Sequence, residues 1–272
     1  MKMKKWLKIA LAGAVALGLI AQPATAEALT VQEVQDKGEI VLGTSADFPP
    51  FEWVKMVDGQ ETTLGADIEL AQAIADELGV ELVIRNSSFD SLITQVQTGK
   101  VDMVIAGMSY TPERAEQALF SDVYFTGTNY FLTNHDIAAT IQSLDDVHNL
   151  RLGVQRGSIQ EALLKEHVPE ATDLTMIPDN GDLVQSLLTN RIDAILFDHI
   201  VATQFAAQHE GKLQIVEGVE VPNGDDGGMS IVVSNDSQEL LDVINKVIGE
   251  LTESGQYEAW IEEYIPQIDQ IS

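Results

Sequence analysis

Thr111, Pro112 and Arg114 form a short pattern that could hold a negatively charged ligand. Thr111 and Pro112 are residue types favoured at the cap and the first position of a helix, so Arg114 falls in the first helical turn. That turn already carries the positive end of the helix dipole, and a further cation there is unfavourable unless an anion lies between them. The helix N–H groups and the arginine fork together predict a carboxylate site.

Asp198 supplies the opposite charge. It follows the apolar run RIDAILF, which predicts a buried strand, and ligands of open α/β sheets bind beyond the carboxyl ends of strands. Gly157 and Ser158 also follow an expected strand and open an expected helix, so they are a second candidate anion site. Simpler roles stay open: an ion pair of Arg114 with Asp122, a helix cap at Asp198, and an ordinary turn at Gly157 and Ser158.

Strands and helices alternate along the chain that must position these residues. Residues 39–43 predict a strand, and Asp67 is expected to cap an amphipathic helix that stops at Gly79. The next strand is expected at 81–85. Such alternation is typical of an α/β protein in which helices cover both faces of a mostly parallel sheet.

One stretch of sequence occurs in two similar copies. LITQVQTGKVDMVIA (92–106) resembles LVQSLLTNRIDAILF (183–197). In each copy a helix is expected to end at Gly99 or Asn190, the residue types that tolerate a left-handed cap, and a buried strand follows. We interpret the two copies as equivalent places in two similar α/β lobes.

The residues that follow the two copies differ in charge. The first copy leads to Gly107, Ser109 and Arg114, and the second leads to Asp198. If the two lobes face each other, one wall of the cleft is cationic and rich in donors, and the other wall is anionic. The guest that matches both walls carries a carboxylate and an ammonium group close together, as an α-amino acid does.

The composition argues against several other functions. The chain has 15 Lys and Arg against 43 Asp and Glu, a formal net charge of −28, which repels nucleic acid and anionic lipid. It has no cysteine, so it cannot form disulfides, cysteine metal sites or a cysteine-linked lipid anchor. The histidines lack the spacing of metal ligands. We expect no cofactor, no metal and no nucleic-acid partner.

The first residues have the pattern of a secretory signal peptide. Lysines precede an apolar run at 9–21, and Ala24-Thr25-Ala26 is a small-residue cleavage site, so residues 1–26 are expected to be removed. The apolar run falls short of the ~20 residues that span a membrane. We expect an exported protein, in the periplasm or at the outer face of the cytoplasmic membrane, without a lipid anchor.

Six segments together resemble one known family, the polar amino acid substrate-binding proteins of ABC transporters (bacterial extracellular solute-binding proteins, family 3). The resemblance extends from about residue 38 to about residue 264. The segments that carry it are GTSADFPPFEW (43–53), GADIELAQAIADELGV (65–80), FDSLITQVQTGKVDMVIAGMSYTPER (89–114), FSDVYF (120–125), LGVQRGSIQE (152–161) and RIDAILFD (191–198).

The resemblance implies the type II fold of periplasmic binding proteins, with two α/β lobes joined by two crossings. Residues 27–126 and 228–272 would form lobe 1, and residues 127–227 would form lobe 2. The crossings would fall near Phe125–Thr128 and Pro222–Gly228. The lobes of this family close on one amino acid.

The resemblance also assigns roles to residues. Arg114 would grip the α-carboxylate and Asp198 the α-ammonium group, while Phe48 and Phe89 would pack along the ligand's side chain. Ser45 departs from the pattern, because members that bind basic amino acids often have an aspartate there. The remaining ligand contacts would come from backbone and hydroxyl groups at Gly107, Ser109, Gly157 and Ser158.

The expected function is capture of an L-α-amino acid and its delivery to the membrane permease of an ABC importer, by a monomer. Ser45 offers no charge to a basic side chain, so we rank a polar neutral ligand such as glutamine first. Arginine is second, because Asp47 or Glu52 could reach the pocket and the phenylalanines could stack on a guanidinium.

The alternative is a periplasmic dehydratase-like enzyme on the same scaffold. An enzyme needs a general acid or base in the cleft, and the candidates are Asp198 and His199. Whether His199 contacts the ligand is open from the sequence.

Overall fold

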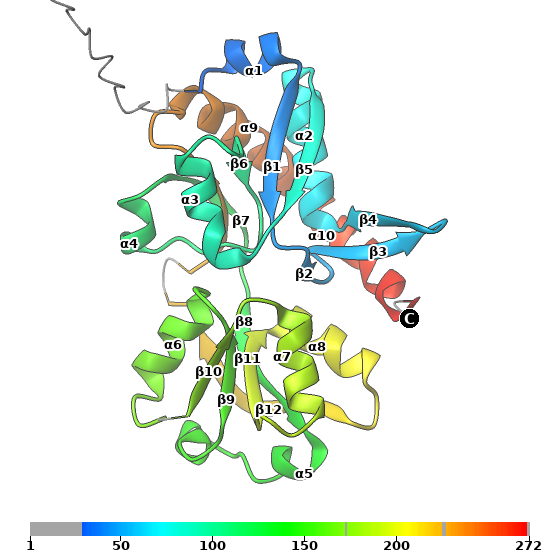
Figure 1. The fold of residues 1–272 in the computed structure, drawn as a ribbon, viewed down its shortest axis with the longest axis vertical. Coiled ribbons are helices and arrows are strands. Elements are labelled where there is room, and N and C mark those ends of the chain that lie inside the picture. The colour runs from blue at the N-terminus through cyan, green and yellow to red at the C-terminus, as the bar shows by residue number, and fades with distance from the viewer. Residues whose placement is uncertain (1–28, 172, 225–226, 271–272) are drawn as a thin grey trace, which may run out of the picture.

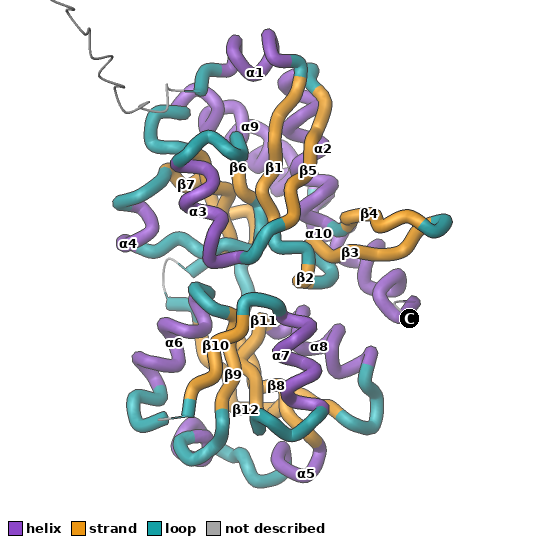
Figure 2. The backbone as a smooth tube through the Cα atoms, in the orientation of Figure 1, coloured by secondary structure: helices purple, strands orange, loops and turns teal. Residues whose placement is uncertain are grey.

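The protein consists of two α/β lobes placed end to end (Figures 1 and 2). This computed structural model describes residues 29–171, 173–224 and 227–270, so the expected signal peptide at 1–26 lies outside the described residues. No helix within those described ranges is long and apolar enough to cross a membrane.

The first lobe is built on a five-stranded sheet with the order β5-β1-β6-β13-β7. Apolar side chains on α2 and α9 pack on this sheet, and Leu42, Ile74 and Ile244 have no exposed surface. The strands are β1 (Glu39–Thr44), β5 (Glu81–Asn86), β6 (Met103–Val104), β7 (Leu119–Phe125) and β13 (Met229–Val233). The helical segments are α1 (Val31–Lys37), α2 (Ala66–Leu78), η1 (Phe89–Ser91), α3 (Leu92–Gln97), α4 (Pro112–Ala115), α9 (Gln238–Ser254), α10 (Gln256–Tyr264) and η3 (Ile265–Gln270).

A small antiparallel sheet projects from the side of the first lobe (Figure 1). Its strands are β2 (Asp47–Phe48), β3 (Glu52–Val57) and β4 (Gln60–Leu64). The turn between β2 and β3 brings Asp47, Phe48 and Glu52 together where the two lobes meet.

The second lobe repeats the plan of the first with the strand order β10-β9-β11-β8-β12. A second cluster of buried apolar side chains, including Phe131 and Leu196, fills one face of this sheet. The strands are β8 (Thr128–Asn134), β9 (Leu152–Gln155), β10 (Leu174–Ile177), β11 (Ala194–Asp198) and β12 (Leu213–Pro222). The helical segments are α5 (His135–Ala138), η2 (Leu144–Val147), α6 (Ile159–His167), α7 (Asn180–Leu188) and α8 (His199–Gln208).

The two sheets confirm the interpretation of the sequence repeat. Strands β6 and β11, one from each copy, occupy the same central place, parallel to β1 and β9 respectively. In both sheets the strand that enters from the other lobe, β13 or β8, is antiparallel to its neighbours. Gly99 and Asn190 adopt left-handed φ angles of 65° and 56°, as expected from their positions after α3 and α7.

The helix expected to begin with a cap at Asp67 begins differently. Its cap is Gly65, with φ 132°, and an added Cβ there would lie 2.1 Å from the carbonyl oxygen of Phe51. Asp67 is instead fully buried inside the first turn, where it accepts hydrogen bonds from Tyr257 Oη (2.6 Å) and Tyr124 Oη (3.0 Å). The capping prediction was wrong because the tyrosines that bind Asp67 lie far from it in the sequence. The local pattern around Asp67 could not indicate this pairing. The stop at Gly79 and the strands at 39–43 and 81–85 are confirmed.

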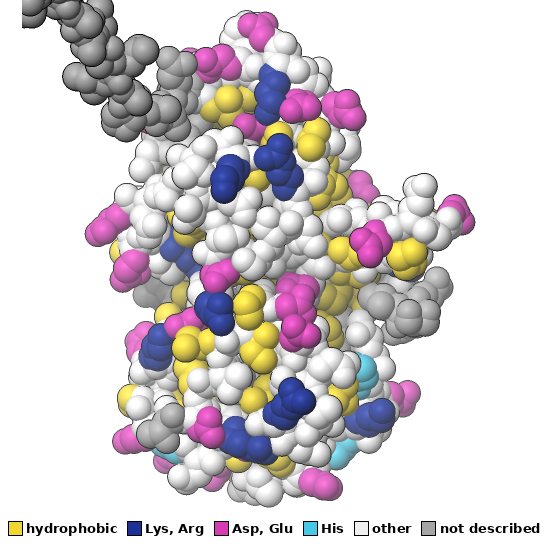
Figure 3. All heavy atoms as spheres, viewed as in Figure 1, with side chains coloured by type: hydrophobic (Ala, Val, Ile, Leu, Met, Phe, Trp, Pro, Cys, Tyr) yellow, Lys and Arg dark blue, Asp and Glu magenta, His cyan; other side chains and the backbone are white. Residues whose placement is uncertain are grey.

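Charged side chains are distributed over both lobes. On the face drawn in Figure 3, acidic and basic side chains intermingle, and neither sign is gathered on one lobe. The acidic side chains are therefore not concentrated in one patch on that face.

Candidate ligand-binding site

A partly enclosed cavity lies between the two lobes and is lined by residues of both. The residues that line it come from the segment after β1, the β2–β3 turn, η1, the segments after β6 and β9, the end of β11, the second crossing and the start of β13. Gly157 is the one predicted site residue outside the lining, although its carbonyl contacts Arg114. The other predicted residues all line it: Ser45, Phe48, Phe89, Gly107, Ser109, Arg114, Ser158 and Asp198.

Arg114 enters the cavity from α4, a single helical turn. Thr111 caps that turn as predicted, with its Oγ1 accepting from the Arg114 backbone N–H at 3.2 Å. The guanidinium donates to the carbonyl oxygens of Ser109 and Gly157 and lies 5.6 Å from the ring centre of Phe89. Burial disfavours the charged form of Arg114 and lowers its pKa to about 10. A ligand carboxylate beside the guanidinium would offset this cost, because an opposite charge favours the charged form.

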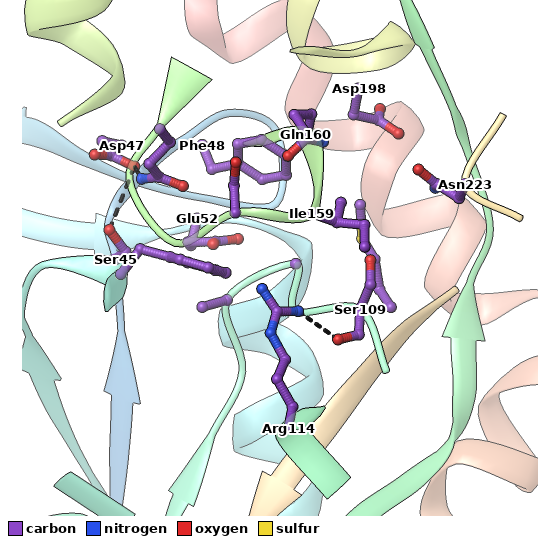
Figure 4. A pocket seen from close by; sticks show the side chains of 16 residues that line it. Ser45, Asp47, Phe48, Glu52, Ser109, Arg114, Ile159, Gln160, Asp198 and Asn223 are labelled. Carbon is purple, nitrogen blue, oxygen red and sulfur yellow. Dashed lines mark hydrogen bonds between the residues drawn. The ribbon is translucent and has the colours of Figure 1, made fainter. Parts of the chain in front are cut away.

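Asp198 faces the cavity from the opposite side (Figure 4). It ends β11 and caps α8, because its Oδ1 accepts from the Ile200 N–H at 2.9 Å. Its Oδ2 is buried without a hydrogen-bond partner among the described residues, and a Cβ added to Gly127 would lie 2.1 Å from it. Burial raises the pKa of Asp198 to about 6. The helix cap left open by the sequence is therefore present, and it occupies only one of the two oxygens.

Glu52 is a second buried acid at the cavity. Its side chain has no exposed surface, and neither oxygen accepts a hydrogen bond from an N–H or hydroxyl group among the described residues, but its carboxyl shares a hydrogen bond with the neighbouring acid Asp67. Figure 4 shows Glu52 among the side chains that line the cavity. Burial, followed by the neighbouring charge of Asp67 and a hydrogen bond with that residue, raises the pKa of Glu52 well above its usual value. A cationic group in the cavity would offset that penalty.

Asp47 is an acid whose oxygens are already satisfied. Its Oδ2 accepts from the Asn180 backbone N–H and its Oδ1 from Asn180 Nδ2, both at 3.0 Å. Gln155 Nε2 donates to the same Oδ1 at 3.4 Å. Burial raises the pKa of Asp47 to about 7. Asp47 belongs to the first lobe, whereas Asn180 and Gln155 belong to the second.

The apolar wall depends on one glycine. Gly107 has φ 57°, and a Cβ there would lie 2.8 Å from Cε1 of Phe48. The Phe48 ring therefore lies directly over the backbone of Gly107 and stacks on Phe51, with 5.6 Å between ring centres. Phe89, the other predicted aromatic residue, lies beneath Arg114.

Several lining residues were missed by sequence reasoning. Gln160 Nε2 donates to Asn129 Oδ1 at 2.7 Å, and Asn223 Nδ2 donates to the Gly127 carbonyl oxygen at 3.0 Å. Gln160 lies two residues after Ser158 in LGVQRGSIQE (152–161), a segment that resembles the family, so its place at the cavity could have been predicted. No such motif contains Asn223, which the tertiary fold brings to the cavity. The missed lining residues are Ala106, Gln155, Ile159, Gln160, Asn223 and Met229.

His199 lies outside the cavity lining. It is exposed, and its ring centre lies 4.6 Å from that of Tyr130. Within the described part of the chain, no group of three or more His, Asp or Glu side chains is arranged to hold a metal ion.

Comparison with known proteins agrees with this architecture. The family model described as "Bacterial extracellular solute-binding proteins, family 3" matches residues 40–267. The arginine-binding extracellular protein ArtP of Bacillus subtilis is 35% identical over 259 residues, which cover 94% of this chain and 96% of ArtP.

Two solved structures extend the comparison. A substrate-binding protein from Streptococcus pneumoniae, bound to L-arginine, is 36% identical, with a TM-score of 0.83 and coverage of 87% of this chain and 97% of that one. An ancestral arginine-binding protein bound to glutamine is 33% identical, with a TM-score of 0.74 and coverage of 84% and 97%.

Proposed function

Because this chain belongs to the bacterial extracellular solute-binding proteins, family 3, we propose that it captures an L-α-amino acid with a cationic side chain, with arginine as the first candidate. The observation that carries this proposal is the set of charged groups in one cavity: Arg114, the buried and unpaired Oδ2 of Asp198, and a second buried acid, Glu52, whose neighbour is the acid Asp67.

Arginine would complete three charge pairs in the cavity. The carboxylate of the ligand would pair with the Arg114 guanidinium, its ammonium group with Asp198 Oδ2, and its guanidinium with the Glu52 carboxylate. A buried charge without a partner is costly, and each pair replaces such a charge with a charge-assisted hydrogen bond. The ring of Phe48 would lie along the aliphatic part of the ligand.

Glutamine, ranked first from the sequence alone, becomes the second candidate. The sequence ranked it first because Ser45 lacks the expected charge, but Glu52 supplies a carboxylate seven residues along the chain. A glutamine amide would leave that carboxylate without a cation, so Glu52 would have to stay protonated. Two relatives support arginine, since ArtP is called arginine-binding and the Streptococcus pneumoniae protein is bound to L-arginine, whereas the ancestral arginine-binding protein is bound to glutamine.

The transport role follows from the family. We propose that residues 27–126 with 228–272 and residues 127–227 move as two lobes that close on the ligand. The closed monomer would then deliver the amino acid to the permease of an ABC importer. We also propose that the protein is exported and has no lipid anchor. The absence of cysteine from the sequence supports the second part of this proposal.

The dehydratase-like alternative is not favoured. The matching family and the relatives named above are solute-binding proteins rather than enzymes. His199, the candidate proton-transfer group other than Asp198, lies outside the cavity lining.

A thermal-shift screen of the twenty amino acids tests the proposal. A ligand at 100 times its Kd stabilises the folded state by ~2.7 kcal/mol, which raises the unfolding temperature measurably. We expect the largest shift with L-arginine and a smaller one with L-lysine. Shifts confined to neutral amino acids would refute the cationic assignment, and no shift with any amino acid would refute the amino-acid assignment itself.

A further inference from the structure

Two acids of the β2–β3 turn line the same cavity but differ in their partners. The hydrogen-bond contact of Glu52 is with Asp67, within the first lobe, whereas both oxygens of Asp47 accept hydrogen bonds from Asn180 of the second lobe. The donors at 3.0–3.4 Å, Asn180 and Gln155, lie in the second lobe, and the Ser45 hydroxyl of the first lobe donates to the same Oδ1 at a longer 3.5 Å. A side chain committed in this way has little capacity left for a ligand, so Asp47 requires a separate explanation.

We propose that Asp47 is a latch between the lobes: it caps the start of α7 in the closed protein and thereby sets ligand affinity without binding the ligand. The proposal rests on the proposed capture of an amino acid between the lobes. Asp47 acts as a positioning residue, because its partner is the opposite lobe.

The geometry at α7 suits such a latch. Asn180 is the first residue of α7, where backbone N–H groups have no partner within the helix. Asp179 caps the helix from its own lobe by accepting from the Asp182 N–H at 2.8 Å. That cap leaves the Asn180 N–H and Nδ2 free to meet Asp47 when the lobes come together. Asn180 is 1% exposed, so the contact is largely shielded from water.

The latch lies next to the ligand contacts. Asp47 is flanked in sequence by Ala46 and Phe48, and both Ser45 and Phe48 line the cavity. The Ala46 N–H donates to Asn86 Oδ1 at 2.9 Å, which anchors the turn to the end of β5. The same short segment therefore touches both the ligand space and the opposite lobe, so closure on a ligand brings Asp47 to α7.

A second contact between the lobes provides a matched comparison. Arg156 and Asp90 approach to 3.7 Å across the same cleft, and their side chains are 51% and 30% exposed. Exposed ion pairs contribute little because water and salt screen them. Removing Asp90 is therefore a control that deletes a carboxylate at the cleft without deleting the latch.

The test removes the latch from each side separately. Asp47→Ala removes the acceptor. Asn180→Pro removes both donors, and proline is well tolerated at the first position of a helix. Asn180→Ala, which removes only the side-chain donor, serves as a milder variant. Kd and dissociation rate are measured for L-arginine and, in parallel, for L-glutamine, together with the unfolding temperature of the ligand-free protein.

We expect Asp47→Ala and Asn180→Pro each to weaken binding by about tenfold to a hundredfold, because two hydrogen bonds to a charged group are lost. The loss appears mainly as faster dissociation, and it is the same factor for every ligand that binds. The double variant is no weaker than the weaker single variant, because both changes break one contact. Asp90→Ala changes Kd by less than about threefold.

Three results would overturn the latch. Loss with Asp47→Ala but not with Asn180→Pro would mean that Asp47 binds the ligand directly. A loss confined to L-arginine would mean that Asp47 acts through pocket charge. Independent, multiplying losses in the double variant would mean that the two residues do not act through one contact. If the parent protein binds only L-glutamine, the proposed function fails while the latch is still tested with that ligand.

Discussion

Replacing Asp198 with asparagine separates its two tasks in the site. Its Oδ1 caps α8, and asparagine is as good a helix cap as aspartate, so Asp198→Asn keeps the fold. Its Oδ2 is the buried, unpaired oxygen that we assign to the ligand's ammonium group. The substitution exchanges that oxygen for an amide nitrogen or a neutral oxygen, neither of which balances a positive charge.

The expected loss follows from the burial of this side chain. Asp198 is 2% exposed, so a charge pair formed there is fully desolvated. Truncating one partner of such a pair costs about 2–5 kcal/mol, which corresponds to roughly a thirtyfold to several-thousandfold increase in Kd. The same loss is expected for every α-amino acid, because the ammonium group is common to all of them.

Titration calorimetry at pH 7.5 measures the effect, and Asp146→Asn is the control. Asp146 also accepts backbone N–H hydrogen bonds at the start of a helical segment of the second lobe, η2, but it lies outside the lining of the central cavity, so the Kd of this variant should stay near that of the parent protein. An unfolding temperature near the parent value in both variants shows that the caps are kept. Near-parental affinity in Asp198→Asn would refute the assignment and leave Asp198 as a helix cap alone.

Three further outcomes are expected. Arg114→Lys should bind at least about tenfold more weakly by calorimetry, because a point charge cannot form the two parallel bonds of the arginine fork; unchanged affinity would contradict the carboxylate role. The affinity for arginine should fall as pH drops below about 6, because Asp198, whose pKa is raised to about 6, becomes protonated there. The fall should be steeper than for glutamine, because burial also raises the pKa of Glu52 and only arginine needs Glu52 ionised. Binding to the ionised acid should therefore release protons at pH 5.5. Calorimetry in two buffers of different ionisation enthalpy measures this release, and proton uptake would contradict this account. Small-angle scattering should show a smaller radius of gyration with saturating L-arginine, and identical curves would contradict closure of the lobes.

The architecture of the lobes was accessible from sequence because its signals are local. The repeated segment at 92–106 and 183–197 records one supersecondary unit used twice, and Gly99 and Asn190 mark its left-handed turns. The cap at Thr111 and the placement of Arg114 follow from residue types three positions apart. Such patterns need no knowledge of the rest of the chain.

The chemistry of the buried acids was not accessible in the same way. Glu52 lies in the motif PPFEW, and the sequence indicated only that it could reach the pocket, not that it is fully buried beside Asp67. Its burial depends on α2 and on Asp67, whose own tyrosine partners come from β7 and α10. Asp67 was mistaken for a helix cap for the same reason. The contact of Asp47 with Asn180 joins residues 133 positions apart, and no local pattern encodes it.

The most direct test of the account is the relative affinity for L-arginine and L-glutamine in the parent protein and in Glu52→Gln. We expect the parent to bind L-arginine at least about tenfold more tightly, and Glu52→Gln to lose most of that preference while keeping its affinity for L-glutamine, because only the cationic side chain needs the carboxylate. A parent protein that prefers L-glutamine, or a Glu52→Gln variant that keeps the full preference for L-arginine, would contradict the claim that Glu52 selects the ligand's charge.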